Sequence, residues 1–406
     1  MPRPRIAILH QGCVPTYRRA FYERLGAIAE RDYIVFHGEV EPGSGVVAAA
    51  PPFGFENVEV RNRFLTVVGR TLVYQPVFSR IAHGDFDALV IGHEVKYLAN
   101  MALAPLFRAL GKPVLLWGFG RNTDIKLYQR SRLGLAVGRA VSFAQRRMLR
   151  GATDFLAYTE AGARHAAKAG MPQDRITVLN NTIDISGEIA AHAQAQSLDR
   201  AALRQELGLS TQGMVFLFVG RLNEPKRVDA LIETARELRQ RHGTAIEVLV
   251  VGSGPMESRL RAAAAGEAWC QFLGQIQDSV ALSRIFRASD AVVIPGYVGL
   301  AVNHAFAHGL PVITCQSEIH SPEIEYIEND VNGLILHSLT DLGVGLLRFA
   351  ASAELRRSLA AGALRSRDKL ELQRMVESFD DGVRRAIERS SAGRRRDRHA
   401  LDTRLQ

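Results

Sequence analysis

Cysteine is scarce in this chain, which has three cysteines among 406 residues: Cys13, Cys270 and Cys315. They stand far apart, without the paired cysteine and histidine spacing of a structural zinc site. Nor do they suggest a disulfide framework of the kind that small secreted domains use. We therefore expect each thiol to be a small, chemically inert core residue.

Long hydrophobic runs are also missing, since no apolar stretch approaches the ~18–20 residues that cross a bilayer. The chain opens with Met-Pro-Arg-Pro-Arg and passes directly into the apolar run 6–9, which does not resemble a secretory signal. We expect a cytoplasmic protein.

Negative charge is in deficit, because the formal net charge is +9. An excess of positive charge favours binding to nucleic acid, to anionic lipid head groups or to phosphorylated small molecules. The chain lacks zinc-finger spacing and the aromatic-basic motif of RNA-binding sheets, so nucleic acid is the least favoured partner.

What the chain does contain is a regular alternation of apolar strands with helical segments. Hydrophobic residues make up 47% of the chain, as in ordinary globular proteins, and the length exceeds what one core supports. The pattern predicts an α/β protein with two doubly wound, Rossmann-like parallel-sheet domains facing across a cleft. The clearest predicted strands are 5–10, 33–36, 88–91, 114–117, 154–158, 214–219, 246–251, 270–273, 292–294 and 311–314. The predicted parts are a first domain (1–184), a connector (185–210), a second domain (211–389) and a basic, disordered tail (390–406).

Several polar residues of the first domain follow predicted strands, at the edge where open α/β sheets bind ligands. Arg18 instead starts a predicted helix, where a cation opposes the helix dipole. It is therefore either solvated surface or a contact for an anionic ligand. The acceptor-side candidates are Gln11, Gly12, Arg18, His93, Glu94 and Trp117.

Residues 130–150 are predicted to form a basic helix with six arginines and no acidic residue. One-sided charge suits an anionic surface such as a membrane leaflet. A helix that packs on the core and exposes a solvated basic rim explains the same pattern, and both readings stay open.

A glycine loop lies between the predicted strand 292–294 and the predicted short helix 301–307. Pro295 and Gly296 end the strand, and a loop that leads into a helix start offers unpaired N–H groups to an anion. We expect a phosphorylated ligand at Gly299 and Leu300.

Residues 214–340 resemble the C-terminal domain of the retaining GT-B glycosyltransferases of family 4. The resemblance rests on Phe-Val-Gly-Arg-Leu…Lys at 218–226, Val-Gly-Ser-Gly-Pro at 251–255, Phe-Leu-Gly-Gln at 272–275, Gly-Leu…Ala-Phe-Ala-His-Gly-Leu-Pro-Val at 299–312, and Glu325 followed by Asn332-Gly333. It implies a nucleotide-diphosphate sugar as donor, bound without a metal or another cofactor. The candidate catalytic residues are Arg221, Lys226 and His304, and the candidate donor-binding residues are Gly220, Gly274, Gln275, Gly296, Gly299, Leu300 and Glu325. Among these, Arg221 and Lys226 would clamp the diphosphate, which needs fixed cations as its charge builds up.

The first domain is more loosely similar to exopolysaccharide-building members of that family. This similarity implies a glycan or lipid-linked acceptor and a peripheral position at the inner face of a membrane.

The chain departs from the family at three positions. The family's paired glutamates fall on Gly296 and His304, and a frequent loop histidine is replaced by Phe119. His304 is either a protonated anion contact or a core histidine. An active transferase is the favoured function. The alternatives are an impaired nucleotide-sugar-binding partner in a polysaccharide assembly complex, and an epimerase of this fold using Glu94 and Glu325.

Overall fold

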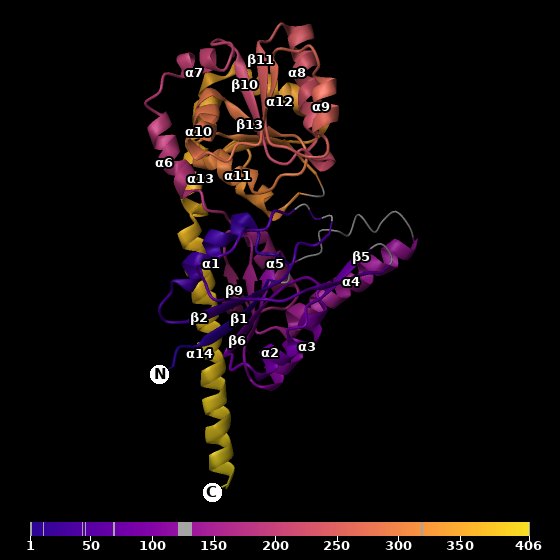
Figure 1. The fold of residues 1–406 in the computed structure, drawn as a ribbon, viewed down its shortest axis with the longest axis vertical. Helices are drawn as coiled ribbons and strands as arrows, with labels where there is room; N and C mark the ends of the chain where they lie inside the picture. The colour runs from indigo at the N-terminus through magenta and orange to yellow at the C-terminus, as the bar shows by residue number, and fades with distance from the viewer. Residues whose placement is uncertain are drawn as a thin grey trace. The chain divides into compact units, whose positions relative to one another are not determined.

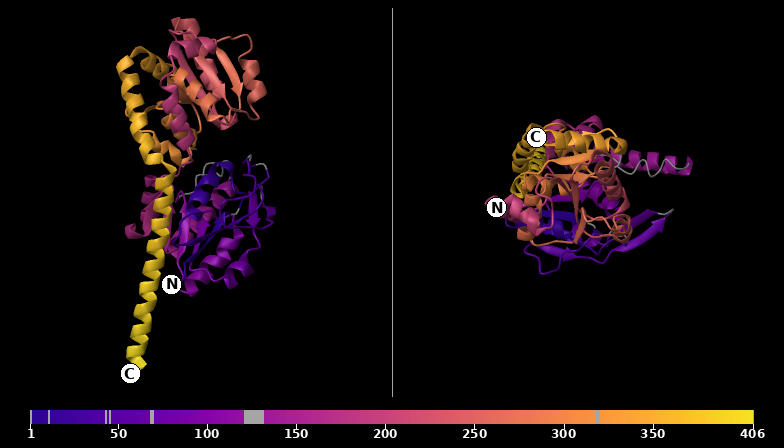
Figure 2. Two further views of the ribbon diagram at one scale, coloured as in Figure 1. Left: turned by 60° about the vertical axis from the view of Figure 1, so that its left-hand side comes forward. Right: turned by 90° about the horizontal axis from the view of Figure 1, so that it is seen from above.

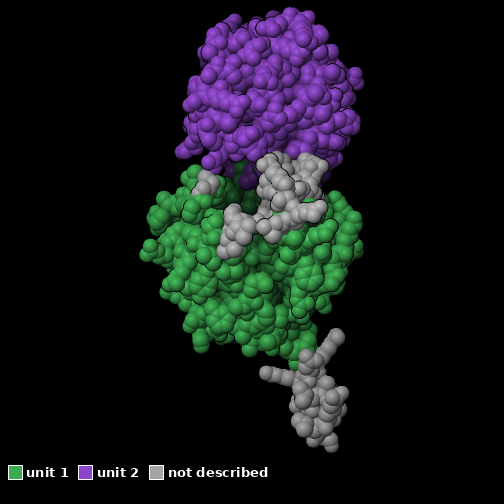
Figure 3. All heavy atoms as spheres, turned by 90° about the vertical axis from the view of Figure 1, so that its right-hand side faces the viewer, with its two compact units in different colours: residues 1–183, 372–406 green, residues 184–371 purple. Residues whose placement is uncertain are grey.

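The structure is a computed structural model that describes residues 2–10, 12–42, 44, 46–67, 70–120, 132–317 and 320–405. Side chains are described for these residues except 67, 70, 132–133 and 395–405. The chain forms two compact units (Figure 3). The first comprises Met1–Ile183 and Leu372–Gln406, and the second comprises Asp184–Glu371.

A seven-stranded parallel sheet forms the centre of the first unit, in the order β3-β2-β1-β6-β7-β8-β9 (Figure 1). The strands are short apolar runs because both faces of the sheet are covered. Along β1, Ile6 and Ile8 face one core cluster, whereas Ala7 and Leu9 face the other. The bounds are β1 (Arg5–His10), β2 (Asp32–His37), β3 (Asn57–Glu59), β6 (Ala88–Gly92), β7 (Val114–Gly118), β8 (Asp154–Ala157) and β9 (Ile176–Val178).

Helices cover both faces of this sheet. Phe21 and Leu25 of α1 share a core cluster with Phe379 of α14, and Leu103 of α3 belongs to the opposite cluster. An antiparallel hairpin, β4–β5, is an element that the sequence patterns did not predict. The helices are η1 (Thr16–Arg18), α1 (Arg19–Gly26), α2 (Phe78–His83), α3 (Leu98–Ala109), α4 (Arg132–Gly151), α5 (Glu160–Lys168), η3 (Gln173–Arg175) and α14 (Leu372–Leu405), and the hairpin strands are β4 (Arg63–Val67) and β5 (Arg70–Tyr74).

Helix α14 corrects two predictions about the end of the chain. It is the long yellow helix of Figure 2, and it runs to Leu405 where we expected a disordered tail from residue 390. It also belongs to the first unit and not to the second domain, because Met375, Phe379 and Val383 lie in the first unit's core. Tyr33 donates a hydrogen bond to Asp380 (2.7 Å), which fixes the helix beside β2.

The second unit contains a six-stranded sheet with the order β12-β11-β10-β13-β14-β15, in which every pair is parallel. Strand order reverses between β10 and β13, and the loops that follow these two strands therefore open at the sheet's switch point. The bounds are β10 (Met214–Val219), β11 (Ile246–Val251), β12 (Cys270–Gly274), β13 (Ala291–Ile294), β14 (Val312–Cys315) and β15 (Gly333–Leu336). The two parallel sheets confirm the prediction of an α/β protein with two Rossmann-like parallel-sheet domains.

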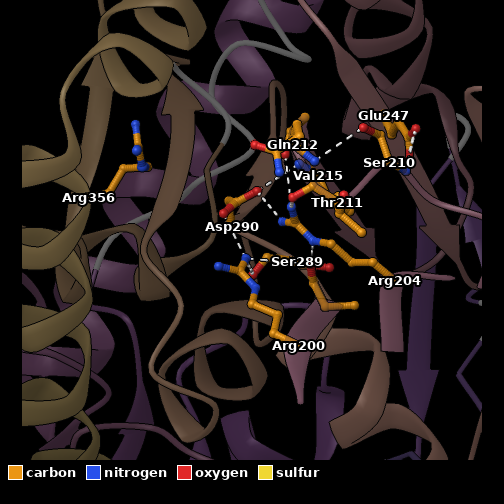
Figure 4. Close-up of polar contacts among 12 residues, drawn as sticks. Arg200, Arg204, Ser210, Thr211, Gln212, Val215, Glu247, Ser289, Asp290 and Arg356 are labelled. Atoms are coloured by element: carbon orange, nitrogen blue, oxygen red, sulfur yellow. Dashed lines mark hydrogen bonds and ion pairs between the residues drawn. The ribbon is translucent and has the colours of Figure 1, made fainter. Parts of the chain in front are cut away.

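The predicted connector 185–210 contains two helices, α6 and α7, that pack on α10 of the second unit. Arg204 of α7 is 5% exposed and holds this contact by pairing with Asp290 (2.7 Å) at the start of β13 (Figure 4). These helices are thus part of a domain. The helices of the second unit are α6 (Ser186–Ala195), α7 (Arg200–Glu206), η4 (Glu224–Lys226), α8 (Val228–His242), α9 (Glu257–Ala263), α10 (Ser279–Ala288), α11 (Ala301–Ala307), η5 (Pro322–Tyr326), η6 (Leu339–Asp341), α12 (Leu342–Ala351), α13 (Ala353–Arg367) and η7 (Asp368–Leu370).

The three cysteines are buried and unpaired with one another, as expected. Burial raises the pKa of the Cys270 thiol to about 12 and that of the Cys315 thiol to about 11. In the described part of the chain, no helix has the length and apolar character needed to span a membrane.

Candidate functional site

The loops after β10 and β13 meet at the switch point of the second unit's sheet. Two backbone hydrogen bonds join them: the Gly296 N–H donates to Lys226 O (3.1 Å), and the Tyr297 N–H donates to Pro225 O (2.7 Å). The two strands are themselves paired through Phe216 and Ala291. The sheet therefore fixes both loops as one structure.

Gly296 is required by this close approach. A Cβ atom at position 296 would lie 2.0 Å from Pro225 O, a distance that real Cβ atoms essentially never show. This position corresponds to the first glutamate in the family that the sequence resembles. The structure has no room here for any side chain, so a glutamate would require a different path of the loop.

Lys226 lies at the centre of the joined loops and is only 9% exposed. Its Nζ is 5.1 Å from the centroid of the Tyr297 ring and 3.7 Å from where a Cβ atom on Gly299 would stand. Burial lowers the pKa of Lys226 to about 8, although the negative charge of Glu323 partly opposes this shift. The ammonium group is thus desolvated and poorly compensated, which an anionic ligand would correct.

His320 is a site residue that the sequence patterns did not reveal. It is 8% exposed, accepts a hydrogen bond from the Val298 N–H at Nδ1 (3.1 Å), and donates from Nε2 to Cys315 O (2.9 Å). These two bonds define a neutral tautomer, and burial lowers the pKa of His320, as does the nearby Lys226 cation. The imidazole thereby anchors the loop after β13 to the end of β14.

A second rim of the site comes from the loops after β10, β11 and β12. A Cβ atom on Gly252 would stand 1.9 Å from Gly220 O, and Gly252 donates its N–H to Gly274 O (2.8 Å). Gly220, Gly252 and Gly274 have positive φ angles of 143°, 137° and 70°, a region that favours glycine. Gln275 is exposed next to them. The structure therefore brings the predicted Gly220, Gly274 and Gln275 to one edge.

The remaining predicted donor-site residues differ in exposure. Arg221 is exposed in the loop after β10, and Leu300 is the half-buried residue that precedes α11. Glu325 is half-buried in η5, whereas Glu323 of the same turn is 2% exposed and is the carboxylate whose charge acts on Lys226. The sequence patterns selected Glu325 and missed Glu323.

His304 of α11 is held by an acidic partner from another helix. Its Nδ1 lies 2.7 Å from Glu188 Oε1 of α6, and its side chain is 29% exposed. This pairing fixes the imidazole ring.

In the first unit, three of the predicted acceptor-side residues lie together, because the Arg18 guanidinium is 5.4 Å from the Trp117 ring centroid and the His93 N–H donates to Trp117 O (3.0 Å). His93 is 4% exposed, its Nε2 is 3.0 Å from Gln145 O of α4, and burial lowers its pKa. Glu94 is exposed and pairs with Lys96 (3.4 Å). Gly12 borders open space, and Gln11 lies outside the described residues.

Arg18 is neither solvated nor turned toward open space. It is 5% exposed, donates to Asn181 Oδ1 (2.6 Å) and to Thr182 O (3.3 Å), and its guanidinium lies 5.4 Å from the Trp117 ring centroid. Trp117 itself packs against Phe379 of α14. Both residues thus join parts of the first unit that are distant in sequence. Phe119, at the third departure from the family, is also buried, at 8% exposure.

Residues 213–348 match the protein family described as glycosyl transferases group 1. D-inositol 3-phosphate glycosyltransferase of Actinosynnema mirum is 30% identical over 197 residues, which cover 45% of this chain and 46% of that protein. The protein of the same name from Nocardia farcinica is 35% identical over 157 residues, covering 36% and 33%. The chain thus spans less than half the length of these two curated relatives.

Solved structures resemble the chain over nearly its whole length. Anabaena HepE in complex with UDP superposes with a TM-score of 0.63 at 15% identity, covering 93% of this chain and 98% of that chain. WaaG, a glycosyltransferase involved in lipopolysaccharide biosynthesis, gives 0.64 at 18% identity, with coverages of 93% and 99%. Sucrose-phosphate synthase of Thermosynechococcus elongatus gives 0.65 at 17% identity, with coverages of 94% and 99%. The chain therefore has the GT-B fold, and its residues 213–348 match the group 1 glycosyltransferases.

Proposed function

We propose that the protein is a retaining, metal-independent glycosyltransferase that moves a hexosyl or deoxyhexosyl group from a nucleotide-diphosphate donor to a glycan hydroxyl. The observation that carries the proposal is the buried Lys226 ammonium, which lies beside Gly299 where the loops after β10 and β13 join. The proposed reaction uses the nucleotide-diphosphate sugar as its donor substrate and needs no cofactor. The match of residues 213–348 to group 1 glycosyltransferases supports it.

The chemistry asks for cations, because the nucleotide diphosphate leaves with its bonding electrons and gains negative charge. A desolvated ammonium stabilises that charge more strongly than one in water. The arrival of a diphosphate raises the pKa of Lys226 again and keeps it protonated. Arg221, exposed in the same loop, supplies a second cation that can bond two phosphate oxygens.

A test compares Lys226→Ala with Lys369→Ala, which removes an exposed lysine of the same unit whose side chain is 70% exposed. UDP and UDP-glucose are the first probes, because a neighbour of the same fold was solved with both. We expect Lys226→Ala to lower sugar transfer about 10²-fold, as for other positioned charge donors, and Lys369→Ala to match the parent. Unchanged transfer in Lys226→Ala would rule out the proposed role.

The residues at the two glutamate positions favour a second candidate, a catalytically impaired nucleotide-sugar-binding partner. Gly296 has no side chain to offer a sugar, and His304 is engaged by Glu188. Nucleotide-diphosphate binding without sugar release, with a broad donor panel and lysate lipids as acceptors, would select this candidate. Formation of a new sugar nucleotide without an acceptor would instead select an epimerase.

For the acceptor we propose a lipid-linked or surface glycan that is met at an anionic membrane surface by helix α4. Phe143 of α4 is 64% exposed and Leu135 is 39% exposed. They share the helix with exposed arginines at positions 139, 146, 147 and 150. An apolar and basic surface of this kind suits a leaflet of anionic lipids. Co-sedimentation with phosphatidylglycerol vesicles should be lost in Arg146→Glu/Arg147→Glu. If that variant co-sedimented as well as the parent, the proposed contact between α4 and a membrane would be wrong.

A further inference from the structure

The second unit contains a cavity of about 700 Å³ at the edge of its sheet opposite the glycine loops. Asp290 and Leu310, which line it, lie one and two residues before β13 and β14, so they mark the amino ends of these parallel strands. Helices α6, α7, α10 and α13 supply most of the remaining wall. A volume of this size is typical of small-molecule sites.

The cavity wall carries an excess of positive charge. Five arginines line it, at positions 200, 287, 356, 357 and 367, and the only acidic lining residue among the described residues is Asp290. Asp290 is already paired, since Oδ1 accepts from Arg200 (2.7 Å) and Oδ2 accepts from Arg204 (2.7 Å) and from the Val215 N–H (2.8 Å), as Figure 4 shows. Its charge is therefore not available to the other arginines.

Among the remaining arginines, Arg367 has a distant acidic partner, since its Nε lies 3.6 Å from Oδ1 of the exposed Asp368. Arg356 donates to Phe349 O (3.0 Å) and Ala350 O (2.5 Å), which carry no net charge. The buried Nε of Arg287 has no hydrogen-bond partner in the described structure. Burial lowers the pKa of Arg287 and the neighbouring Arg200 lowers it further, although the negative charge of Asp199 partly opposes this shift. The pKa of His192 falls for the same reasons, through burial and through Arg367 and Arg287. The cations thus repel one another across one space.

One wall of the cavity is apolar and flat. The Phe286 ring stacks on His308 with centroids 4.0 Å apart and an interplanar angle of 6°. Leu310 and Leu364 extend this wall. The buried Nε2 of His308 has no hydrogen-bond partner in the described structure. The cavity therefore combines a basic side with a side suited to a ring or another apolar group.

We propose that this cavity binds a small phosphate-bearing molecule with an apolar or ring portion, independently of the proposed donor site. Guanidinium groups recognise phosphate oxygens in pairs, so Arg287 and Arg367 would hold the phosphate. The wall around Phe286 would hold the apolar portion. A bound anion would also relieve the repulsion among the cations. Without an anion, the cluster of arginines would only cost folding free energy.

The test measures calorimetric binding of phenyl phosphate and inorganic phosphate at constant ionic strength, without any sugar donor. We expect saturable binding, tighter for phenyl phosphate, and about tenfold weaker in Arg287→Ala and in Arg367→Ala, equivalent to ~1.4 kcal/mol. Arg284→Ala is the matched control, because Arg284 lies on the same helix α10 but pairs with Glu206 and does not line the cavity. It should bind as the parent does, as should Lys226→Ala.

Several results would overturn the proposal. They are absence of saturable binding, equal weakening by Arg284→Ala and Arg287→Ala, and loss of binding in Lys226→Ala, which would place the phosphate at the glycine loops. Equal affinity for phenyl phosphate and inorganic phosphate would contradict the proposed contact between the wall around Phe286 and an apolar portion of the ligand. Circular dichroism and thermal unfolding establish that each variant is folded. Since no donor is present, failure here leaves the proposed transferase function standing, and the reverse also holds.

Discussion

In each unit, a buried cation lies shortly after the strand of the parallel sheet that comes first in the chain, and the two cations have opposite surroundings. Arg18 follows β1 and is 5% exposed, whereas Lys226 follows β10 and is 9% exposed. Arg18 has oxygen acceptors at 2.6 Å and 3.3 Å and rings around it. Lys226 has an aromatic ring, a glycine backbone and a lowered pKa.

The difference separates a structural cation from one that is prepared for a ligand. Asn181 and Thr182, which accept from Arg18, end the first segment of the first unit, so the arginine ties down the point where the chain leaves that unit. The protein gives Lys226 too little negative charge to keep it protonated at high pH. Burial of both residues is similar, and the partners decide the role.

The most severe test of this comparison is Gly296→Ala, which should break the loop around Lys226. The added Cβ would stand 2.0 Å from Pro225 O, a backbone atom that cannot move alone. We expect a loss of more than about 3 kcal/mol in the free energy of unfolding, measured with urea. Gly299→Ala is the control, because its Cβ would meet Lys226 Nζ at an ordinary 3.7 Å. Similar stability of the two variants would contradict the geometry of the joined loops.

The next test exchanges each cation for methionine, which removes the charge and keeps an unbranched side chain. Arg18→Met should lose ~2–3 kcal/mol of unfolding free energy, since charged hydrogen bonds are lost and buried acceptors stay unpaired. Lys226→Met should be neutral or stabilising, because it removes a desolvated charge. Denaturant midpoints measure both. A larger loss for Lys226→Met than for Arg18→Met would reverse the assigned roles.

The pH dependence sharpens the same contrast. Unfolded lysine keeps its proton to about 10.4, whereas folded Lys226 releases it near pH 8. Between these values the unfolded chain binds more protons, so this residue makes the free energy of unfolding rise with pH. Donor binding should fall over the same window, because the empty site loses its cation.

Parallel titrations of the parent, Lys226→Met and Lys226→Arg would check this dependence. Lys226→Arg keeps its charge throughout, so its donor affinity should stay flat across pH 8. If the donor affinity of the parent did not change across pH 8, Lys226 would not control donor binding.

The smallest effect is expected from His304→Ala. His304 of α11 pairs with the buried Glu188, so we expect a stability loss of about 1 kcal/mol. Transfer should fall less than in Lys226→Ala, as read from initial rates. A decrease as large as that of Lys226→Ala would make the histidine an equal partner of the lysine.

Local patterns predicted the strands and the glycine loops, because apolar runs and glycines can be read directly from the sequence, although the contact that requires Gly296 is made with the remote Pro225. Strand Met214–Val219 is a continuous apolar run, and the close approach at Gly296 forbids a side chain. The partners of Arg18 are 163 and 164 residues away, so no local pattern could assign its role. The choice between Glu323 and Glu325 depends on which side of a short 3₁₀ turn faces Lys226, and sequence spacing does not determine that.

The return of α14 to the first unit has a consequence for synthesis. The second unit is one uninterrupted stretch, 184–371, and it leaves the ribosome before residues 372–405 exist. The earliest-made strands must wait with an uncovered apolar face until Met375 and Phe379 arrive. The second unit can therefore fold first, whereas the first unit, whose chain begins earlier, is completed last.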